Sequence, residues 1–312
     1  MVTETSRPWR RIPAPLLFVV GGSSMYVGAA LAVGLFDRLS PSAVAVLRIF
    51  GAGVVLLAWR RPGGPAWRGV RMARAITFGM ATALMNIAFY EAIDRLPLGT
   101  TVALEFCGPV AVAALASRRA RDVAAVVLAA GGVLLIADVR WSASTSGLLW
   151  ALAAAAMWAA YIVLGKRVAA AGNGVDDMAV GFFVASVVLS PLVFLAGHAQ
   201  LAALADPVVL LLAVGVGVLS SVIPYGLDQV VLKRVGQARF AVLLALLPAT
   251  ATVIGVIALG QVPGALEGVG IAAVIAAVAL RSRDGDVPAS PDRPPAEEAE
   301  LTHRNTRSGD RE

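Results

Sequence analysis

Cysteine and histidine are nearly absent from this chain of 312 residues. The one cysteine, Cys107, stands inside an apolar run, and the two histidines are His198 and His303. A disulfide framework needs paired cysteines, and Cys/His metal sites need these residues in clusters. The sequence therefore excludes both, and it has few of the cysteine and histidine side chains on which nucleophilic catalysis commonly depends. We predict no cofactor, no metal site and no enzymatic activity.

Charge is also scarce. Charged residues make up 15% of the chain and hydrophobic residues 58%, with a mean hydropathy of +0.79. A soluble domain usually has about 45–50% apolar and about 25% charged residues. The apolar excess lies in runs of roughly 18–22 residues, the length that crosses about 30 Å of hydrocarbon as a helix. These runs predict an all-α integral membrane protein whose first partner is the lipid bilayer.

Apolar length and polar breaks mark ten predicted transmembrane helices. The first apolar run is long enough to span a membrane, and further runs follow it, so we interpret it as a retained helix rather than a signal peptide. The ten ranges are 13–35, 40–59, 71–92, 97–117, 121–139, 146–165, 178–196, 207–227, 238–259 and 264–281.

The basic residues orient these helices. A net charge of +6 suggests nucleic acid as a partner, but the arginines and lysines lie in short clusters between apolar runs, which is typical of a membrane protein and argues against a nucleic-acid partner. If the N-terminus is cytoplasmic, the cytoplasmic segments contain the clusters at 7–11, 60–74, 118–121, 166–167, 233–239 and 281–283, and the opposite side contains only Arg38, Arg95 and Arg140. The positive-inside rule therefore predicts an N-in, C-in protein of the bacterial cytoplasmic (inner) membrane.

The two ends of the chain are polar. Residues 1–12 form the predicted cytoplasmic N-terminus. Residues 284–312 are rich in Pro, Glu, Asp, Arg and Ser and contain almost nothing apolar. Such a segment buries too little surface to offset its ordering entropy, so we predict a disordered cytoplasmic tail.

The chain resembles itself at an offset of about 139 residues. Residues 91–109 (EAIDRLPLGTTVALEFCGP) align with residues 230–248 (VVLKRVGQARFAVLLALLP), and both stretches run from a span end through a charged turn into a helix with a proline. This pattern divides the chain into five-helix repeats at 13–139 and 146–281. Because each repeat has an odd number of spans, the two are inverted, an arrangement typical of secondary transporters. The alternative is that apolar helices simply resemble one another.

Several stretches resemble the EamA family of the drug/metabolite transporter superfamily over residues 13–281. The similarity is clearest in GLLWALAAAAMWAAYIVLGKRVA (147–169), IPYGLDQVVLKRV (223–235) and LLALLPATATVIGVIALGQ (243–261). In the first half, Leu104-Glu105-Phe106 followed by Gly108-Pro109 is similar to the threonine/homoserine exporter branch. This resemblance implies a transporter with a site between the repeats. Gln261 departs from the family, where a glutamate often stands.

Glu105 is the residue most indicative of transport. It lies near the middle of the fourth span, where an ionised carboxylate is costly and usually functional or paired. Pro109 lies four residues later on the same face and has no N–H, so the carbonyl of residue 105 loses its helical partner. Glu105 either handles substrate or protons, or ties helices together. Arg48, midway along the second span, either holds a substrate carboxylate or forms a structural ion pair.

Other polar and aromatic residues are candidates for lining the site, each with a structural alternative. Asn86 and Tyr90 on the third span, and Tyr225 and Gln229 on the eighth, predict a polar stripe from each side, although the tyrosines also fit interfacial positions. Trp158 and Tyr161 share a face of the sixth span and wall a cavity or pack between helices. Pro248 repeats the helix break of Pro109 without the acid. Thr250 and Thr252 follow it, but threonine in a membrane helix usually bonds its own backbone.

These residues favour an exporter of amino acids or related small metabolites that works by alternating access, either coupled to protons or facilitative. The alternatives are the same fold carrying drugs, nucleosides or sugar derivatives, and a non-transporting scaffold or sensor. A membrane enzyme acting on lipids would need a polar catalytic cluster that the sequence lacks. The predicted partner is a small-molecule substrate, and the oligomeric state is a monomer or a homodimer.

Overall fold

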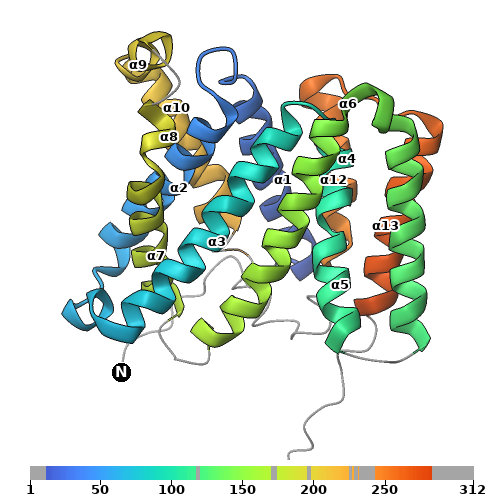
Figure 1. Ribbon diagram of the computed structural model, residues 1–312, viewed down its shortest axis with the longest axis horizontal. Helices are drawn as coiled ribbons and strands as arrows, with labels where there is room; N and C mark the ends of the chain where they lie inside the picture. Colours follow the sequence, from blue (N-terminus) through green and yellow to red (C-terminus); the bar gives the residue numbers. More distant parts are fainter. Residues whose placement is uncertain are drawn as a thin grey trace, which may run out of the picture.

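A computed structural model describes residues 12–116, 120–169, 174–194, 198–224, 227, 231 and 243–282. These residues are mostly helical, with no strand among them, and Figure 1 shows a bundle in which the longer helices run from one end of the molecule to the other. The predicted all-helical chain with several apolar helices is thus confirmed for the described residues. The predicted N-terminus (residues 1–11 of it) and the tail lie outside them.

The first half begins with helices that match the predicted spans closely. Ser40 caps the second helix by accepting the N–H of Ala43 at 3.3 Å, and Pro41 occupies its first position, where no N–H is needed. The fourth predicted span is divided at Phe106. The elements are α1 (Ala14–Val33), α2 (Pro41–Arg60), the short 3-10 helix η2 (Gly64–Trp67), α3 (Gly69–Ile93), α4 (Leu98–Glu105) and α5 (Cys107–Ala116).

The fifth and sixth predicted spans form one helical element, α6 (Ala120–Ala169), interrupted at Ser144. Ser144 has φ −160° and ψ 77°, outside the helical region, so the chain reverses there. Figure 1 shows the resulting two legs joined at the upper end. The sequence predicted a loop between these spans, whereas the structure turns the chain within a few residues.

The second half contains more breaks than the sequence predicted. Asp206 caps one helix by accepting the N–H of Val208 at 2.9 Å, and Pro207 follows it. Gly260, with φ 67°, ends another in the left-handed conformation that glycine tolerates. The elements are α7 (Gly174–Leu189), α8 (Pro191–Phe194), α9 (His198–Leu204), α10 (Pro207–Gly217), the π-helix η3 (Val218–Val222), α12 (Leu246–Leu259) and α13 (Ala265–Ser282).

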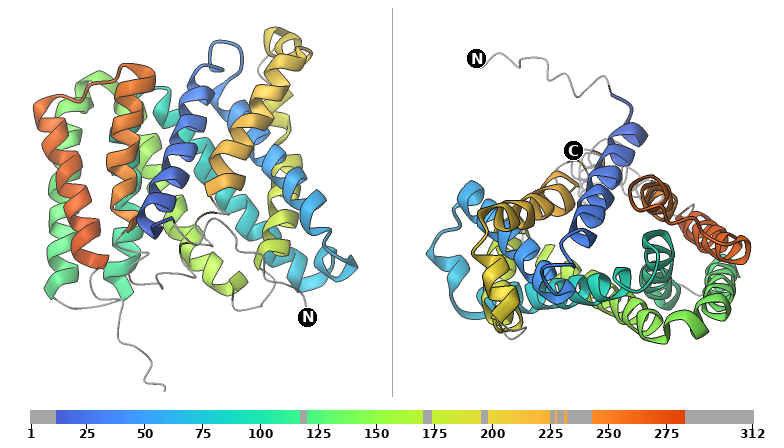
Figure 2. Two further views of the ribbon diagram at one scale, coloured as in Figure 1. Left: turned by 180° about the vertical axis from the view of Figure 1, so that it is seen from behind. Right: turned by 90° about the horizontal axis from the view of Figure 1, so that it is seen from above.

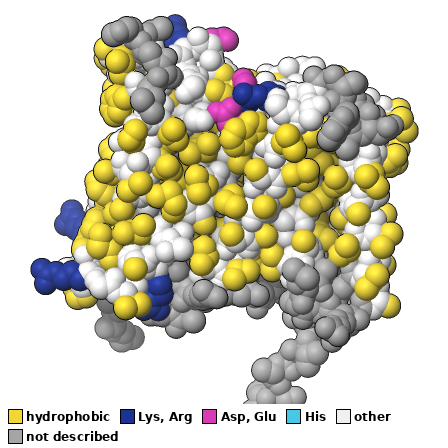
Figure 3. Space-filling view, in the orientation of Figure 1, with side chains coloured by type: hydrophobic (Ala, Val, Ile, Leu, Met, Phe, Trp, Pro, Cys, Tyr) yellow, Lys and Arg dark blue, Asp and Glu magenta, His cyan; other side chains and the backbone are white. Residues whose placement is uncertain are grey.

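Within the described residues, four helical segments are long and apolar enough to cross a membrane: Ala14–Val33, Pro41–Arg60, Gly69–Ile93 and Ser144–Leu164. The remaining apolar helices, of 10–17 residues, are Leu98–Val112, Val123–Ile136, Pro207–Val222, Leu246–Leu259 and Ala265–Leu280. Large apolar side chains such as Val127 (66% exposed) and Ile257 (77% exposed) point outward. On the visible face in Figure 3, hydrophobic side chains cover the middle and charged ones gather at the two ends. This surface suits a lipid environment.

Glycines allow the helix backbones to approach closely, which matters because lipid provides no hydrophobic drive for helix association. A Cβ atom on Gly79 would lie 2.1 Å from the carbonyl oxygen of Gly181, so α3 and α7 touch backbone to backbone. A Cβ on Gly217 would lie 2.6 Å from the carbonyl oxygen of Arg48, which brings α10 onto α2. Seen from above, α1 lies between α10 and α12 (Figure 2, right).

Gly131 and Gly132 provide a matched test of this packing. A Cβ on Gly132 would lie 2.7 Å from the carbonyl oxygen of Gly270 in α13, whereas a Cβ on Gly131 meets nothing within 4 Å. Alanine raises helix propensity equally at both positions, by about 1 kcal/mol. We therefore expect Gly132→Ala to lower the thermal unfolding midpoint in detergent by at least about 3 °C relative to Gly131→Ala. Equal midpoints, measured by tryptophan fluorescence, would contradict the close contact.

Candidate functional site

Arg48 is a buried cation in the middle of α2, with 8% of its surface exposed. Its Nη2 atom donates to the carbonyl oxygen of Ser220 at 2.9 Å, while Nη1 donates to the hydroxyl of Tyr90 and Nε to the hydroxyl of Ser221, each at 3.4 Å. The guanidinium also lies over the ring of Tyr90, 5.5 Å from its centre. No carboxylate of the described residues lies within 4 Å of it. Neutral groups therefore hold this charge in place.

The π-helix η3 supplies two of these groups. It crosses α1, where the hydroxyl of Ser24 donates to the carbonyl of Leu219 at 2.8 Å and the hydroxyl of Ser220 donates to the carbonyl of Met25 at 3.1 Å. Only glycine fits at position 28 of α1, because a Cβ there would lie 2.1 Å from the hydroxyl oxygen of Ser220. π-Helical turns are rare in proteins, and those that do occur often lie at functional sites. Here the turn joins α1, α2 and α10 around Arg48.

Glu105 is the last residue of α4, and 8% of it is exposed. The helix breaks at the next residue, Phe106, and resumes at Cys107. The break lies three residues before Pro109, which lacks an N–H. Within the described part of the chain, no hydrogen bond or ion pair joins the carboxyl group to another residue. The carboxyl group of Glu105 and the guanidinium of Arg48 are thus both buried, and no ion pair joins them.

The face of α4 that contains Glu105 carries a second polar group. Thr101 lies one turn earlier, is fully buried, and its hydroxyl has no hydrogen-bond partner among the described residues. Buried polar groups are normally hydrogen-bonded, so such a hydroxyl calls for an explanation. Sequence analysis missed Thr101 because a threonine in a membrane helix gives no signal beyond its usual bond to its own backbone.

α4 is itself held firmly at its first turn. The side-chain Oε1 of Gln261 accepts the N–H of Leu98 at 2.9 Å, and the hydroxyl of Thr100 donates to the carboxylate of Glu267 on α13. Glu267 is 1% exposed and also accepts the N–H of Gly264 at 3.3 Å. Gln261, which departs from the resembled family, thus satisfies an N–H at the start of α4, one of the groups a helix leaves unpaired.

The two predicted residues of α3 behave differently. Tyr90 is completely buried and joins the group around Arg48, which argues against an interfacial position for it. The amide nitrogen of Asn86 donates to the carbonyl of Thr82 at 2.8 Å, one turn back along its own helix. Asn86 lies four residues before Tyr90 and therefore on the same helix face, but its amide group is hydrogen-bonded to the backbone of its own helix.

The predicted aromatics of the second α6 leg separate into two places. The ring of Trp158 packs edge-on against Phe106, with centroids 4.7 Å apart, beside the break that follows Glu105. The ring of Tyr161 packs against Phe78 of α3 at 4.9 Å, in an apolar cluster with Phe182 of α7. Trp158 thus neighbours the candidate site, and Tyr161 belongs to the packing between α3, α6 and α7.

The corresponding residues of the second half are only partly described. Tyr225 and Gln229 lie outside the described residues. Pro248 stands in the first turn of α12, after a turn at Ala245. The hydroxyls of Thr250 and Thr252 donate to the carbonyls of Leu246 and Pro248, each four residues back, as sequence analysis expected.

Sequence analysis missed the serines of the site. Ser24, Ser220 and Ser221 stand in apolar runs, and serine in a membrane helix usually bonds its own backbone, so nothing in the sequence distinguished them. A further group, the carboxylate of Glu91 with Ser42 and Arg95, lies at the end of α3. Within the described residues, no three His, Cys, Asp or Glu side chains are grouped to hold a metal ion.

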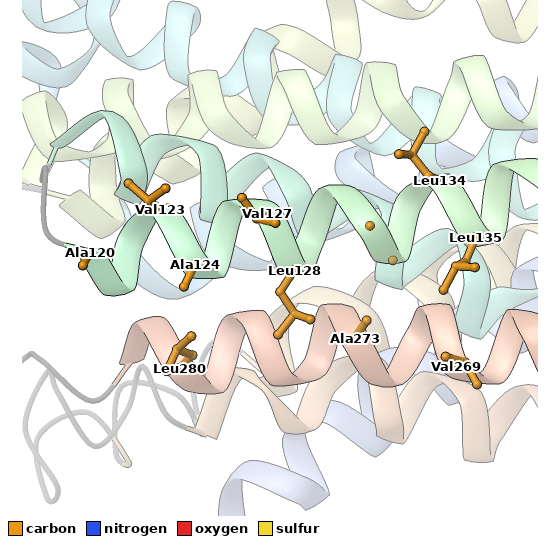
Figure 4. A pocket seen from close by; sticks show the side chains of 12 residues that line it. Ala120, Val123, Ala124, Val127, Leu128, Leu134, Leu135, Val269, Ala273 and Leu280 are labelled. Carbon is orange, nitrogen blue, oxygen red and sulfur yellow. The ribbon is translucent and has the colours of Figure 1, made fainter.

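A groove with a volume of about 1230 Å³ lies between the first leg of α6 and α13. Figure 4 shows it lined by aliphatic side chains such as Val123, Leu128, Val269 and Leu280. It offers no polar side chain to orient a ligand, as small-molecule sites normally do. We therefore place the candidate site at Arg48 and Glu105 rather than in this groove.

Comparisons with known proteins agree with this architecture. Residues 145–283 match the EamA-like transporter family. A protein of known crystal structure shares the fold with a TM-score of 0.57, at 18% identity, over 88% of this chain and 98% of its own.

Curated relatives extend the similarity over most of the chain. The threonine/homoserine exporter RhtA of Salmonella typhimurium (strain SL1344) is 35% identical over 271 residues, covering 84% of this chain and 88% of the relative. The threonine/homoserine exporter RhtA of Escherichia coli (strain K12) is 35% identical over 280 residues, covering 86% and 92%. These relatives are exporters rather than enzymes. The chain therefore belongs to the EamA-like transporter family, a family of multi-pass membrane proteins, in the branch of the threonine/homoserine exporters.

Proposed function

We propose that the protein exports amino acids or related small metabolites across the bacterial cytoplasmic membrane by alternating access. The similarity to threonine/homoserine exporters over more than four fifths of the chain supports this cargo. The site supports it independently, because its charged residues suit a small dipolar molecule. The substrate would bind between the two halves of the bundle, where transporters with repeated halves place their sites.

The observation that carries the proposal is a buried guanidinium and a buried carboxyl group that are not paired with each other. Neither Arg48 nor Glu105 makes an ion pair with a described residue. A buried charge is costly unless it is matched. A free amino acid would match both: its α-carboxylate would accept from the guanidinium of Arg48, and its α-ammonium would donate to Glu105. The unpartnered hydroxyl of Thr101 lies on the Glu105 face and would serve a polar side chain of the substrate.

Glu105 has a second role consistent with the same geometry. A buried carboxyl group that alternately binds and releases a proton is a common device for coupling transport to protons. In that case the substrate amine and the proton would compete for one carboxylate. We therefore assign both amine binding and proton exchange to Glu105. The pH dependence of flux distinguishes the two roles.

We further propose ten membrane crossings arranged as inverted repeats at 13–139 and 146–281. The helix break at Phe106 and the turn at Ala245 are related by the offset of about 139 residues that relates the two halves. Helix contacts are paired in the same way. α1 contacts η3 and α12, and the second leg of α6 makes the corresponding contacts with α3 through Tyr161–Phe78 and with α5 through Ala155–Gly108. α13 contacts the first leg of α6 through Gly270 and Gly132.

The distribution of charge supports an N-in, C-in orientation. The α2–α3 connection and the helix ends beside it, with Arg60, Arg68 and Arg71, lie at one end of the bundle, and the α1–α2 and α3–α4 connections lie at the other (Figure 1). The first end carries more arginines and would face the cytoplasm. The polar segments 1–12 and 284–312 would then both be cytoplasmic.

Other cargoes and a non-transporting role are less well supported. Drugs, nucleosides and sugar derivatives do not in general carry both a carboxylate and an ammonium group, so they would leave one buried charge unmatched. A scaffold or sensor would need no unpaired charges inside its bundle. Competition between substrates and flux measurements in proteoliposomes distinguish these functions.

Removing the charge of Glu105 tests the site directly. Glu105→Gln keeps the size of the side chain but loses a charge-assisted contact, so we expect threonine flux in proteoliposomes to fall by at least about tenfold. Glu105→Asp keeps the charge and serves as the matched control, with an intermediate rate. If Glu105 exchanges protons, the pH dependence of flux disappears in Glu105→Gln. Unchanged uptake, exchange and pH dependence would remove Glu105 from the mechanism.

The role of Arg48 is tested with substrate analogues. Wild-type protein should bind threonine amide, which lacks the carboxylate, at least about tenfold more weakly than threonine. In Arg48→Gln this preference should disappear, because the group that recognises the carboxylate is gone. Arg74→Gln, which changes an exposed arginine on α3, should retain the preference. Equal competition by amide and acid in the wild type would show that Arg48 is structural.

The orientation is tested by labelling single cysteines in a Cys107→Ser background. Asp37 and Gly64 are exposed on opposite ends of the bundle. An impermeant maleimide should label Asp37→Cys in intact spheroplasts, and it should label Gly64→Cys only after permeabilisation. The reverse pattern would invert the topology.

A further inference from the structure

An ion-pair network ties three helix ends together at the proposed cytoplasmic end. Asp177, in the first turn of α7, accepts from Nε of Arg71, in the first turn of α3, at 2.6 Å. Its neighbour Asp176 accepts from Nε of Arg60, the last residue of α2, at 2.9 Å. A third, longer contact of 3.9 Å joins Arg71 to Asp176. The start of α7 is thus linked separately to α3 and to α2.

A single ion pair occupies the proposed outer end in a related position. Arg38, which precedes α2, donates to Asp206, the N-cap residue of α10, at 3.1 Å. Close by, the backbone N–H of Ser40 donates to the side chain of Gln200 on α9 at 2.8 Å. These contacts connect the start of α2 to the segment that leads into α10.

The offset of about 139 residues that relates the two halves also relates these two ion pairs. The position that follows Arg38 by 139 residues is Asp177. The position that precedes Asp206 by 139 residues is Trp67, which lies about one helical turn before Arg71. The outer pair, Arg38–Asp206, joins the starts of α2 and α10. The inner pair, Arg71–Asp177, joins the starts of their counterparts, α3 and α7. The signs of the charges are exchanged between the two pairs. Two inverted halves thus place one ion pair at each mouth of the bundle.

The two pairs differ in burial. The side chains of Arg71 and Asp177 are 25% and 2% exposed, and those of Arg38 and Asp206 are 60% and 37% exposed. Exposed pairs contribute little to stability, whereas separating a buried pair leaves a charge uncompensated. One guanidinium nitrogen of Arg71, Nη2, is buried without a hydrogen-bond partner among the described residues. The inner pair is therefore closed and more buried than the outer pair, with one donor of Arg71 unsatisfied.

We propose that Arg71 and Asp177 act in transport as the ion pair that closes the cytoplasmic mouth, with Arg38 and Asp206 as its counterpart at the outer mouth. The proposal rests on the alternating access of the proposed function. When the bundle opens to take up substrate from the cytoplasm, α3 separates from the start of α7 while the outer pair stays closed. When it opens outward, Arg38 and Asp206 separate and the inner pair holds.

The contact between α2 and α7 behaves differently in this scheme. Exchange of the two halves carries α2 onto α7 and α7 onto α2, and in this proposal α2 and α7 stay together while α3 and α10 move against them. The Arg60–Asp176 pair spans this contact. It neighbours the Arg71–Asp177 pair and shares the first turn of α7 with it, which makes it a control at the same end of the molecule.

Cross-linking distinguishes a moving contact from a fixed one. In a Cys107→Ser background, Arg71→Cys/Asp177→Cys and Arg60→Cys/Asp176→Cys are each bridged with a short thiol reagent that a reductant cleaves. We expect bridging of 71 to 177 to reduce threonine exchange in proteoliposomes by at least about tenfold, with recovery on reduction. Bridging of 60 to 176 should leave exchange unchanged.

The result that overturns the proposal is full exchange by protein whose 71–177 bridge is complete, since the contact would then be static. Equal loss from both bridges also overturns it, because the motion would not be confined to α3 and α7. A charge exchange, Arg71→Asp/Asp177→Arg, provides a second measurement. We expect it to restore the flux that Asp177→Asn loses, and failure to do so in a folded protein counts against the pair. Absence of threonine exchange in the wild type would instead refute the proposed function.

Discussion

The close approach of helix backbones is the constraint on which this bundle depends. Lipid does not drive helices together, so contact must come from packing and from hydrogen bonds that form when backbones are near. Gly28 lets α1 reach η3, and Gly217 lets α10 rest on the carbonyl of Arg48. These two contacts bring the carbonyl of Ser220 within 2.9 Å of the guanidinium. The position of the buried charge therefore follows from small residues elsewhere, and the site is a product of the packing.

Several parts of the fold could be predicted because they depend on local physics. The limits of α1, α2 and α13 follow from apolar length and from caps such as Ser40, and the break near Phe106 follows from the missing N–H of Pro109. The π-helix and the kink at Ser144 were not predictable, because both arise where tertiary contacts override helix propensity. Glu105 and Arg48 stood out as charges in apolar runs. Ser220, Ser221 and Thr101 did not, because only the crossing of distant helices gives their polar groups significance.

The asymmetry between the two halves explains why one of them holds the acid. The break after Glu105 and the turn at Ala245 are similar in form, yet the position corresponding to Glu105 is Leu244, which is apolar. Arg48, by contrast, is bonded to η3 of the second half. Each half therefore contributes to the site differently: the first supplies both charges, and the second supplies the carbonyl that orients one of them.

This division has a consequence for selectivity. The charge of an arginine paired with a neighbouring carboxylate would be neutralised, so a substrate carboxylate would gain little binding free energy from it. Arg48 is instead bonded to a neutral carbonyl and two hydroxyls, so its charge remains available while its geometry is fixed. Glu105 is likewise unpaired among the described residues. A ligand with one charge would match one group and leave the other buried and uncompensated, whereas a small zwitterion matches both. Rejection of singly charged cargo thus arises from the same desolvation that makes the site costly to build.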